Sequence, residues 1–152
     1  MKVAGLDLST TRIGYAATSG ELFSITARAG ASDPYRRIFE LLRNLQNLQP
    51  LTPKPDLVVI EGYAHHSPGA FSLIRLAELG GVIRLWLFTQ NVPFELVAPT
   101  ELKRFATGKG NAHKEEMVAA AISFGAPAGV NHDEADAFHL RRMGLSDYFD
   151  RR

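Results

Sequence analysis

The stretch DLVVIEGYAHH, residues 56–66, decides the fold of this chain. Its continuous apolar run predicts a strand that is buried on both faces, which is typical of a central strand beside a parallel neighbour. The run ends in a carboxylate, Glu61, which is followed by an aromatic residue and two histidines. Polar residues commonly mark the point where a strand reaches solvent, so Glu61 indicates a functional site only if other chemical groups lie beside it.

Upstream of this strand, the sequence predicts a meander followed by a helix. The runs KVAGLDLS, RIGYAATS and ELFSITARA are short and strand-like, and turn signals separate them, so residues 2–29 are predicted to form three antiparallel strands. Asp33 and Pro34 then mark a helix start, and apolar residues recur at helical spacing as far as Leu48.

Downstream, helices alternate with one more strand. An apolar helix is predicted over residues 69–90, a fifth strand over 92–99, and helices over 99–107, 112–125 and 132–144, the last two ended by Gly125 and Gly144. The sum is an α/β chain with a mixed five-stranded sheet, made of three antiparallel strands and then two further strands, flanked by helices. This order fits ribonuclease H-like folds and also other α+β domains, so the acidic residues must decide between them.

Composition restricts the class of protein. A chain of 152 residues with 45% hydrophobic content can bury one core, so residues 1–152 are expected to form a single domain. The absence of Cys excludes a disulfide framework and a thiolate metal site. The N-terminus, MKVAGLDLSTT, lacks the long apolar segment of a secretory signal, and the apolar helix carries three charged residues. We therefore expect a cytoplasmic protein without a membrane span. A net charge of only +1 leaves any nucleic-acid partner to be inferred from local features.

Three further acids are candidates to join Glu61. Asp7 lies between two leucines in the first strand, where a carboxylate either faces water or requires a positive partner. Asp133 and Asp136 are three residues apart on the last predicted helix and share one of its faces. A helix cap involving Glu134 is the alternative explanation for acids at this point. That cap does not account for Asp136, which borders the core side.

The four acids converge if the last helix packs over the sheet where the first and fourth strands end. Ligation by carboxylate oxygens alone suits hard cations and does not suit a soft metal. The sequence therefore predicts a site for Mg²⁺, with Mn²⁺ as an alternative.

Four motifs in a fixed order carry a resemblance to a known family. GLDLSTTRIGYA, LVVIEGYA, GKGNAHKEEM and HDEADAFHL resemble those of the RuvC family of Holliday-junction resolvases, over nearly the whole chain. The resemblance implies a ribonuclease H-like fold, a homodimer, two divalent metal ions per active site and paired nicks in a four-way DNA junction. The sequence DLSTT stands where many members have Pro and Gly after the acid, which is compatible with a phage-type or otherwise divergent member.

The same resemblance assigns roles to individual residues. It places the family's acids at Asp7, Glu61, Asp133 and Asp136, and its basic residue at Lys114. It implies metal-assisted hydrolysis of phosphodiesters with Asp7 bridging the two ions. Lys114 would stabilise the negative charge of the phosphate in the transition state. A solvated lysine at a helix start is the structural alternative for Lys114.

Basic residues gather around the Gly-rich loop that precedes Lys114. Lys103, Arg104 and Lys109 flank this loop, which leads to a helix N-terminus, and such a place favours contacts with DNA phosphates. The loop lacks the Ser or Thr of a nucleotide-binding P-loop, so we expect no nucleotide cofactor.

Aromatic and imidazole side chains near the acids have two interpretations each. Tyr63 can stack on an unpaired base or pack within the protein. His65 and His66 point opposite ways on an extended segment, which favours DNA contacts or plain surface positions over a metal site. His132 and His139 lie close to the acidic pair and can assist proton transfer, but a structural role explains each as well.

The predicted helix over residues 69–90 has apolar side chains over more of its circumference than a one-sided helix needs. Another helix of the same domain can cover the surplus. By resemblance, the same helix of a second subunit would cover it and place two active sites on a two-fold symmetric dimer.

Three other functions use parts of the same pattern. A branch-nonspecific nuclease acting on forks and flaps would carry the same four acids. A non-catalytic binder of branched DNA has no reason to gather negative charge opposite phosphates. An actin-like ATPase or sugar kinase shares the sheet topology, but such proteins need two domains of this type.

Overall fold

The computed structural model describes residues 1–28, 33–48, 53–63, 70–146 and 148–149. Within them the elements, in chain order, are β1 (Val3–Leu8), β2 (Arg12–Ala16), β3 (Leu22–Thr26), α1 (Pro34–Leu48), β4 (Leu57–Glu61), α2 (Ala70–Thr89), β5 (Phe94–Val97), α3 (Pro99–Thr107), α4 (Lys114–Ser123) and α5 (His132–Leu145). The predicted order of strands and helices is confirmed element by element.

The strands form one mixed sheet in the order β3-β2-β1-β4-β5. β1 pairs with β2 and β2 pairs with β3 in antiparallel fashion, whereas β4 runs parallel to both of its neighbours, β1 and β5. The apolar strand that ends at Glu61 is therefore central and lies between parallel neighbours, as its continuous hydrophobic run predicts.

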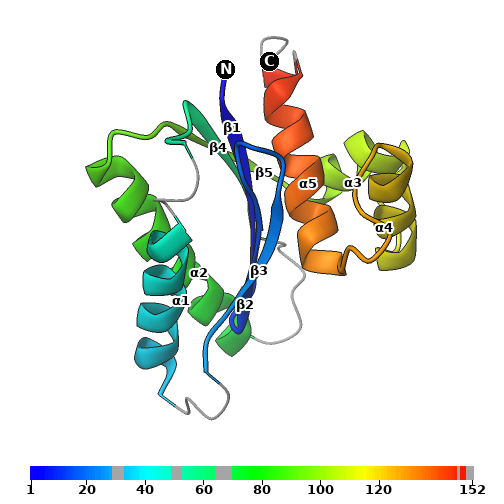
Figure 1. The fold of residues 1–152 in the computed structure, drawn as a ribbon. Helices are drawn as coiled ribbons and strands as arrows, with labels where there is room; N and C mark the ends of the chain where they lie inside the picture. Colours follow the sequence, from blue (N-terminus) through cyan, green and yellow to red (C-terminus); the bar gives the residue numbers. More distant parts are fainter. Residues whose placement is uncertain (29–32, 49–52, 64–69, 147, 150–152) are drawn as a thin grey trace.

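Helices cover both faces of the sheet. α1 and α2 lie on one face, and α3, α4 and α5 lie on the other, with α5 directly against the sheet (Figure 1). Side chains of β1 alternate between the two layers because successive strand residues point to opposite faces. Leu6 packs in the core formed with α1 and α2, and Val3 packs in the core formed with α3, α4 and α5. Asp7 shares the face of Val3, so the first-strand acid is directed toward the α5 layer.

Two glycines let α5 approach the sheet closely. A side-chain carbon at Gly5 of β1 would collide with the carbonyl oxygen of Ala137, and one at Gly14 of β2 would collide with the carbonyl oxygen of Asp133. Both collisions are with the helix backbone, which cannot rotate away. The helix axis therefore lies nearer to β1 and β2 than any larger residue at these positions would allow.

Gly144 does not end the last helix, and that prediction is wrong. α5 continues to Leu145 and is capped by Ser146, while Gly144 is buried inside the helix. A side chain at this position would meet Val3 and Val59 of the sheet, so the glycine provides close packing. Gly125, in contrast, has a positive φ of 104° just beyond α4, as expected for a residue that terminates a helix.

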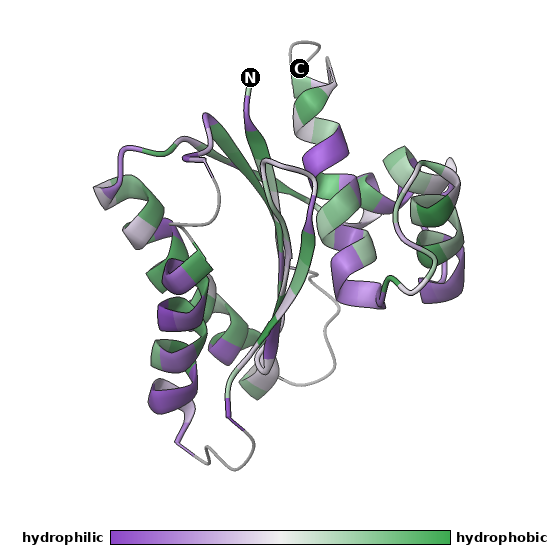
Figure 2. Cartoon of the chain, viewed as in Figure 1, coloured by the Kyte–Doolittle hydropathy of each residue, from purple (hydrophilic) through white to green (hydrophobic). Residues whose placement is uncertain are grey.

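α2 is apolar on more than its sheet-facing side. Leu79, Ile83 and Leu87 are buried against the sheet, but other large apolar side chains of the helix are exposed: Phe71, Ile74, Leu85 and Phe88. Figure 2 shows this hydrophobic character of α2 beside the more hydrophilic outer side of α1. Despite its apolar character, neither α2 nor any other described helix has the length and hydropathy needed to cross a membrane.

Candidate active site

Three carboxylates from distant parts of the chain meet at one edge of the sheet. The register pairs Leu6 of β1 with Ile60 of β4, so Asp7 and Glu61 follow side by side at the carboxyl ends of two parallel strands. Asp136 reaches the same place from α5. One carboxylate oxygen from each of the three residues lies within 4.8 Å of the other two. We call Asp7, Glu61 and Asp136 the acid cluster.

Burial raises the pKa of every member of the acid cluster. The pKa of Asp7 lies well above its usual range because the side chain is buried, and the charge of Glu61 adds to the effect. Burial likewise raises the pKa of Glu61 to about 7 and that of Asp136 to about 7. At neutral pH the cluster therefore retains protons that a bound cation would displace.

The acid cluster fits a divalent metal ion. Oδ1 of Asp136 is buried and has no hydrogen-bond partner among the residues that the structure describes. Buried polar atoms are normally satisfied, so this oxygen requires a partner that a cation would supply. Three converging carboxylates form the oxygen-only ligand set that hard divalent cations prefer.

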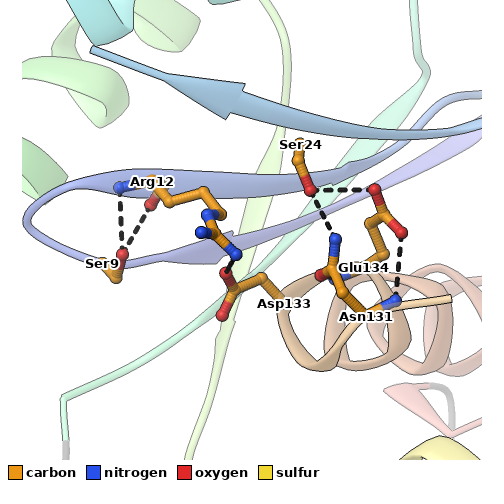
Figure 3. A network of polar contacts seen from close by, with 6 residues as sticks. All are labelled: Ser9, Arg12, Ser24, Asn131, Asp133 and Glu134. Carbon is orange, nitrogen blue, oxygen red and sulfur yellow. Dashed lines mark hydrogen bonds and ion pairs between the residues drawn. The ribbon is translucent and has the colours of Figure 1, made fainter. Parts of the chain in front are cut away.

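Asp133 lies beside the acid cluster but is not a member of it in this structure. Its carboxylate oxygen Oδ2 lies 3.2 Å from Nη1 of Arg12, at the start of β2 (Figure 3). Its charge is still close enough to raise the pKa of Asp136, after the larger effects of burial and of Asp7. Sequence reasoning placed Asp133 with the other acids and did not identify Arg12 as its partner.

A polar network fixes the N-terminus of α5 on the sheet. The side chain of Asn131 accepts a hydrogen bond from the backbone of Glu134, and the Glu134 carboxylate accepts one from the backbone of Asn131. The hydroxyl of Ser24 on β3 donates to Glu134 at 2.8 Å and accepts from Asn131 at 2.7 Å (Figure 3). The predicted cap is confirmed, and it holds the helix turn that carries the two aspartates.

Two lysines bring positive charge to the acid cluster. Burial dominates the raised pKa values of the acids, but Lys114, the first residue of α4, lowers the pKa of both Asp7 and Asp136. Lys103 of α3 acts in the same direction on Glu61 and Asp136. The sequence grouped Lys103 with residues for DNA contact, whereas the structure brings its charge into the neighbourhood of the acids.

Comparison with known proteins identifies the family. The family model described as crossover junction endodeoxyribonuclease RuvC matches residues 3–139. The chain belongs to the RuvC family. Crossover junction endodeoxyribonuclease RuvC of Chlamydia caviae is 30% identical, and the match covers 91% of this chain and 88% of that relative. The same protein of Chlorobium phaeovibrioides is 30% identical, and the match covers 81% of this chain and 70% of that relative.

A solved structure of T. thermophilus RuvC in complex with Holliday junction substrate superposes with a TM-score of 0.73. The superposition covers 98% of this chain and 94% of that chain at 20% sequence identity. This likeness, together with the mixed five-stranded sheet, establishes the RuvC fold for this chain and confirms the ribonuclease H-like architecture expected from the sequence.

In this RuvC-family chain, the two other residues predicted for DNA contact, Arg104 and Lys109, lie near the α3–α4 connection. Nζ of Lys109 is 3.2 Å from a carboxylate oxygen of Glu116, and the Lys109 side chain is largely exposed while that of Glu116 is partly exposed. Arg104 is exposed near the end of α3, close to Gly110. These two residues are therefore on the surface that leads toward Lys114.

Tyr63 lies against α2. Its hydroxyl is 3.5 Å from the carbonyl oxygen of Ala77, and the guanidinium of Arg84 lies 5.7 Å from the centre of its ring. These contacts support packing, the second of its two interpretations. His65 and His66 fall outside the described residues.

His139 is a structural residue and not a proton carrier. It is fully buried, Nε2 donates to the carbonyl oxygen of Met117 at 3.1 Å, and Nδ1 accepts from Arg142 at 3.0 Å. Burial lowers its pKa to about 4, so the ring is neutral and both nitrogens are used. His132 is exposed at the first residue of α5.

Proposed function

We propose that this chain is a metal-dependent, structure-selective endodeoxyribonuclease that resolves four-way DNA junctions by paired nicks. The observation that carries the proposal is the convergence of Asp7, Glu61 and Asp136 at the edge of the sheet. Membership of the RuvC family supports the same activity. The structure of T. thermophilus RuvC, which has the same fold as this chain, has been solved in complex with a Holliday junction substrate.

Mg²⁺ is the proposed cofactor, with Mn²⁺ as an alternative, and we propose two ions per site. Asp7, Glu61 and Asp136 would hold the ions, and Asp133 would complete the ligand set. When bound, the ions supply Lewis-acid stabilisation of the phosphate and a water of lowered pKa. Asp7 contacts Glu61 and its charge acts on Asp136, so it is the residue that we propose would serve both ions.

Protein side chains supply the rest of the proposed chemistry. The ammonium groups of Lys114 and Lys103 lie in the neighbourhood of the acids. They are suited to stabilise the negative charge that a phosphodiester carries in its transition state. Arg104 and Lys109 would hold the DNA backbone further along the α3–α4 connection, where contacts with phosphates position the substrate without selecting its sequence.

We propose a homodimer formed through the exposed apolar face of α2. Phe71, Ile74, Leu85 and Phe88 are 53–75% exposed and lie on one side of α2, as two pairs with a spacing of three residues within each pair. Exposed apolar side chains gathered on one side of a helix mark an interaction surface. An isologous contact would place two active sites symmetrically, which suits paired nicks in a junction that has two-fold symmetry.

We also propose that residues 1–152 act as a single nuclease domain in the cytoplasm, without a nucleotide cofactor. The family model covers residues 3–139, which include all four acids. Both helical layers pack on the same sheet, which supports one folding unit.

The first test is Mg²⁺-dependent cleavage of end-labelled synthetic DNA. A mobile four-way junction, a Y-fork and a linear duplex are compared, with Asp7→Asn as the site variant. We expect symmetric paired nicks on the junction, and we expect Asp7→Asn to abolish cleavage while retaining junction affinity, because it removes metal ligation and lessens repulsion of phosphate. Asp56→Asn, at the opposite end of β4, is the matched control and should cleave normally.

Other outcomes would support other functions. Nicking by Asp7→Asn at the wild-type rate would contradict the active-site assignment. Equal cleavage of fork and junction would indicate the branch-nonspecific nuclease, and binding without cleavage in both Mg²⁺ and Mn²⁺ would indicate a non-catalytic binder of branched DNA.

A further inference from the structure

Arg12 and Asp133 form an ion pair beside the acid cluster. Nη1 of Arg12 lies 3.2 Å from Oδ2 of Asp133, although 121 residues separate them along the chain. The Arg12 side chain is 45% exposed and the Asp133 side chain is 27% exposed. The pair is therefore accessible to solvent ions and to DNA, unlike the buried Asp7.

Asp133 has two competing partners within reach. Among the described residues, the group of carboxylates whose oxygens lie within 4.8 Å of one another consists of the acid cluster and does not include Asp133. Asp133 is nevertheless close enough for its charge to act on all three members. It can pair with Arg12 or approach a cation held by the cluster.

The backbones on both sides of this pair are fixed. The hydroxyl of Ser9 accepts a hydrogen bond from the backbone N–H of Arg12 at 3.0 Å and donates one to its carbonyl oxygen at 2.9 Å (Figure 3). The carbonyl of Asp133 packs on Gly14, and the Asn131 cap holds the same turn of α5. These contacts would hold both backbones in place while the two side chains change partners.

We propose that Arg12 is a positioning residue that competes with a divalent cation for Asp133. In the absence of DNA, the guanidinium holds the Asp133 carboxylate outside the acid cluster. A DNA phosphate offers the guanidinium an alternative anion, which frees Asp133 to complete the metal site. Substrate binding and completion of the metal site are thereby coupled. The inference rests on the proposed metal-dependent function.

Mn²⁺ binding measured by calorimetry without DNA tests the competition. We expect Arg12→Gln to tighten Mn²⁺ binding about three- to fivefold, the range set by a partly exposed ion pair. Arg12→Lys keeps the pair and should bind Mn²⁺ as the wild type does. Arg36→Gln, which breaks a partly exposed arginine–carboxylate pair on α1, is the matched control and should have no effect.

The same substitution in a variant that lacks the Asp133 carboxylate separates the effect of the ion pair from the long-range electrostatic effect of the arginine charge. Removing any positive charge near a metal site strengthens cation binding, whether or not that charge is paired with a particular acid. In an Asp133→Asn background, Arg12→Gln should therefore change Mn²⁺ affinity much less than in the wild type. An equal change in both backgrounds, or none in the wild type, would overturn the role assigned to Arg12.

Loss of the proposed function would give a different result. If the wild type and Asp7→Asn bind Mn²⁺ equally weakly, the acid cluster is not a metal site and both proposals fail. If Mn²⁺ binding depends on Asp7 but does not respond to Arg12→Gln, only the Arg12 proposal fails.

Junction affinity tests the release of Arg12 to phosphate. Arg12→Gln should weaken binding of a four-way junction about three- to tenfold in Ca²⁺, where Asp133 is engaged by the cation and the wild-type guanidinium is free. In EDTA the loss should be smaller, because without a cation the wild-type guanidinium must give up its pairing with Asp133 before it can bind phosphate. An equal loss in Ca²⁺ and EDTA would overturn the exchange of partners.

Discussion

At the scale of single residues, the acid cluster works against the stability of the metal-free protein. A buried carboxylate with a raised pKa binds a proton more tightly in the folded state than in the unfolded state. The free energy of unfolding therefore falls as the pH rises through the interval between the two pKa values. For Asp136 this interval extends from its ordinary value of 3.8 to about 7. The proposed metal site explains why such a group is kept, because a bound cation would remove the penalty.

Asp136→Asn should stabilise the metal-free protein at alkaline pH. The substitution removes the cost of ionising the buried group, on the order of 2–4 kcal/mol at pH 8. The free energy of unfolding, measured by urea denaturation in EDTA, should exceed that of the wild type at pH 8 and differ less at pH 5. Asp56→Asn, on the surface, should follow the wild-type pH dependence, and a variant less stable than the wild type at pH 8 would contradict the burial argument.

At the scale of elements, the site depends on how closely α5 lies on β1 and β2. Asp136 reaches Asp7 only because Gly5 and Gly14 carry no side chain where the helix backbone passes. The polar network at Asn131 then fixes the rotation of the helix. The geometry of the acids is thus set by the packing of backbones and by a cap, and not by the acids themselves.

Gly5→Ala should damage both stability and the metal site. The added carbon meets the backbone of Ala137, so α5 must shift, and we expect a loss of about 1–3 kcal/mol in the free energy of unfolding. Mn²⁺ binding should weaken because Asp136 moves with the helix. Gly129→Ala is the control, since nothing lies within 4 Å of its added carbon in the turn before α5, and it should stabilise the protein by about 0.4–1 kcal/mol. Equal effects of the two substitutions would contradict the close-approach argument.

The basic residues of α3 and of the loop that follows it should dominate the salt dependence of DNA binding. Simultaneous replacement of Lys103, Arg104 and Lys109 by Gln is expected to reduce the slope of log affinity against log salt by about two to three, roughly one for each phosphate contact. Fluorescence anisotropy of a labelled four-way junction at several salt concentrations provides the slope. Replacement of Arg36 and Arg43 on α1, in the other helical layer, should leave it unchanged. An unchanged slope in the triple variant would exclude this surface as the DNA contact.

At the scale of the whole molecule, the two helical layers have different tasks. The helices α3, α4 and α5 lie together on one face of the sheet (Figure 1), and this layer carries Lys103, Lys114 and two of the four acids. The layer of α1 and α2, on the other face, has exposed apolar side chains on α2. In the proposed dimer, the sheet would separate the catalytic side from the association side. A homodimer through α2 would leave both active sites open to DNA.

Leu85→Glu should convert the proposed dimer into monomers. Leu85 is 63% exposed in the described chain, so a charge there costs little in the monomer but is unfavourable within an apolar contact. Sedimentation velocity should show a fall to the monomer mass. In a separate thermal denaturation, the unfolding midpoint of the variant should not drop below that of a diluted wild type, which shows that the variant is folded. Ile122→Glu on α4 is the matched control. A wild type that sediments as a monomer would contradict the proposed interface.

The sequence by itself determined the order of the elements and indicated the three acids that meet at the edge of the sheet. Local patterns in the sequence are enough to predict strands and helices. Here they are the unbroken apolar run that ends at Glu61, the short strand-like runs near the N-terminus, and the glycine and proline signals between elements. The carboxylates were recognisable because a charged residue inside an apolar segment needs a partner.

Only the tertiary structure decided which side chains are partners. The decisive contacts join residues that are distant in the chain, and no periodicity in the sequence encodes them. They are the contacts of Arg12 with Asp133, of Lys103 with the acids, of Gly5 with Ala137 and of Gly144 with the sheet. Gly144 matches the local pattern of a helix end, but its place against Val3 and Val59 keeps it inside the helix. These contacts depend on the register and separation of packed elements, which are set when the two layers close on the sheet.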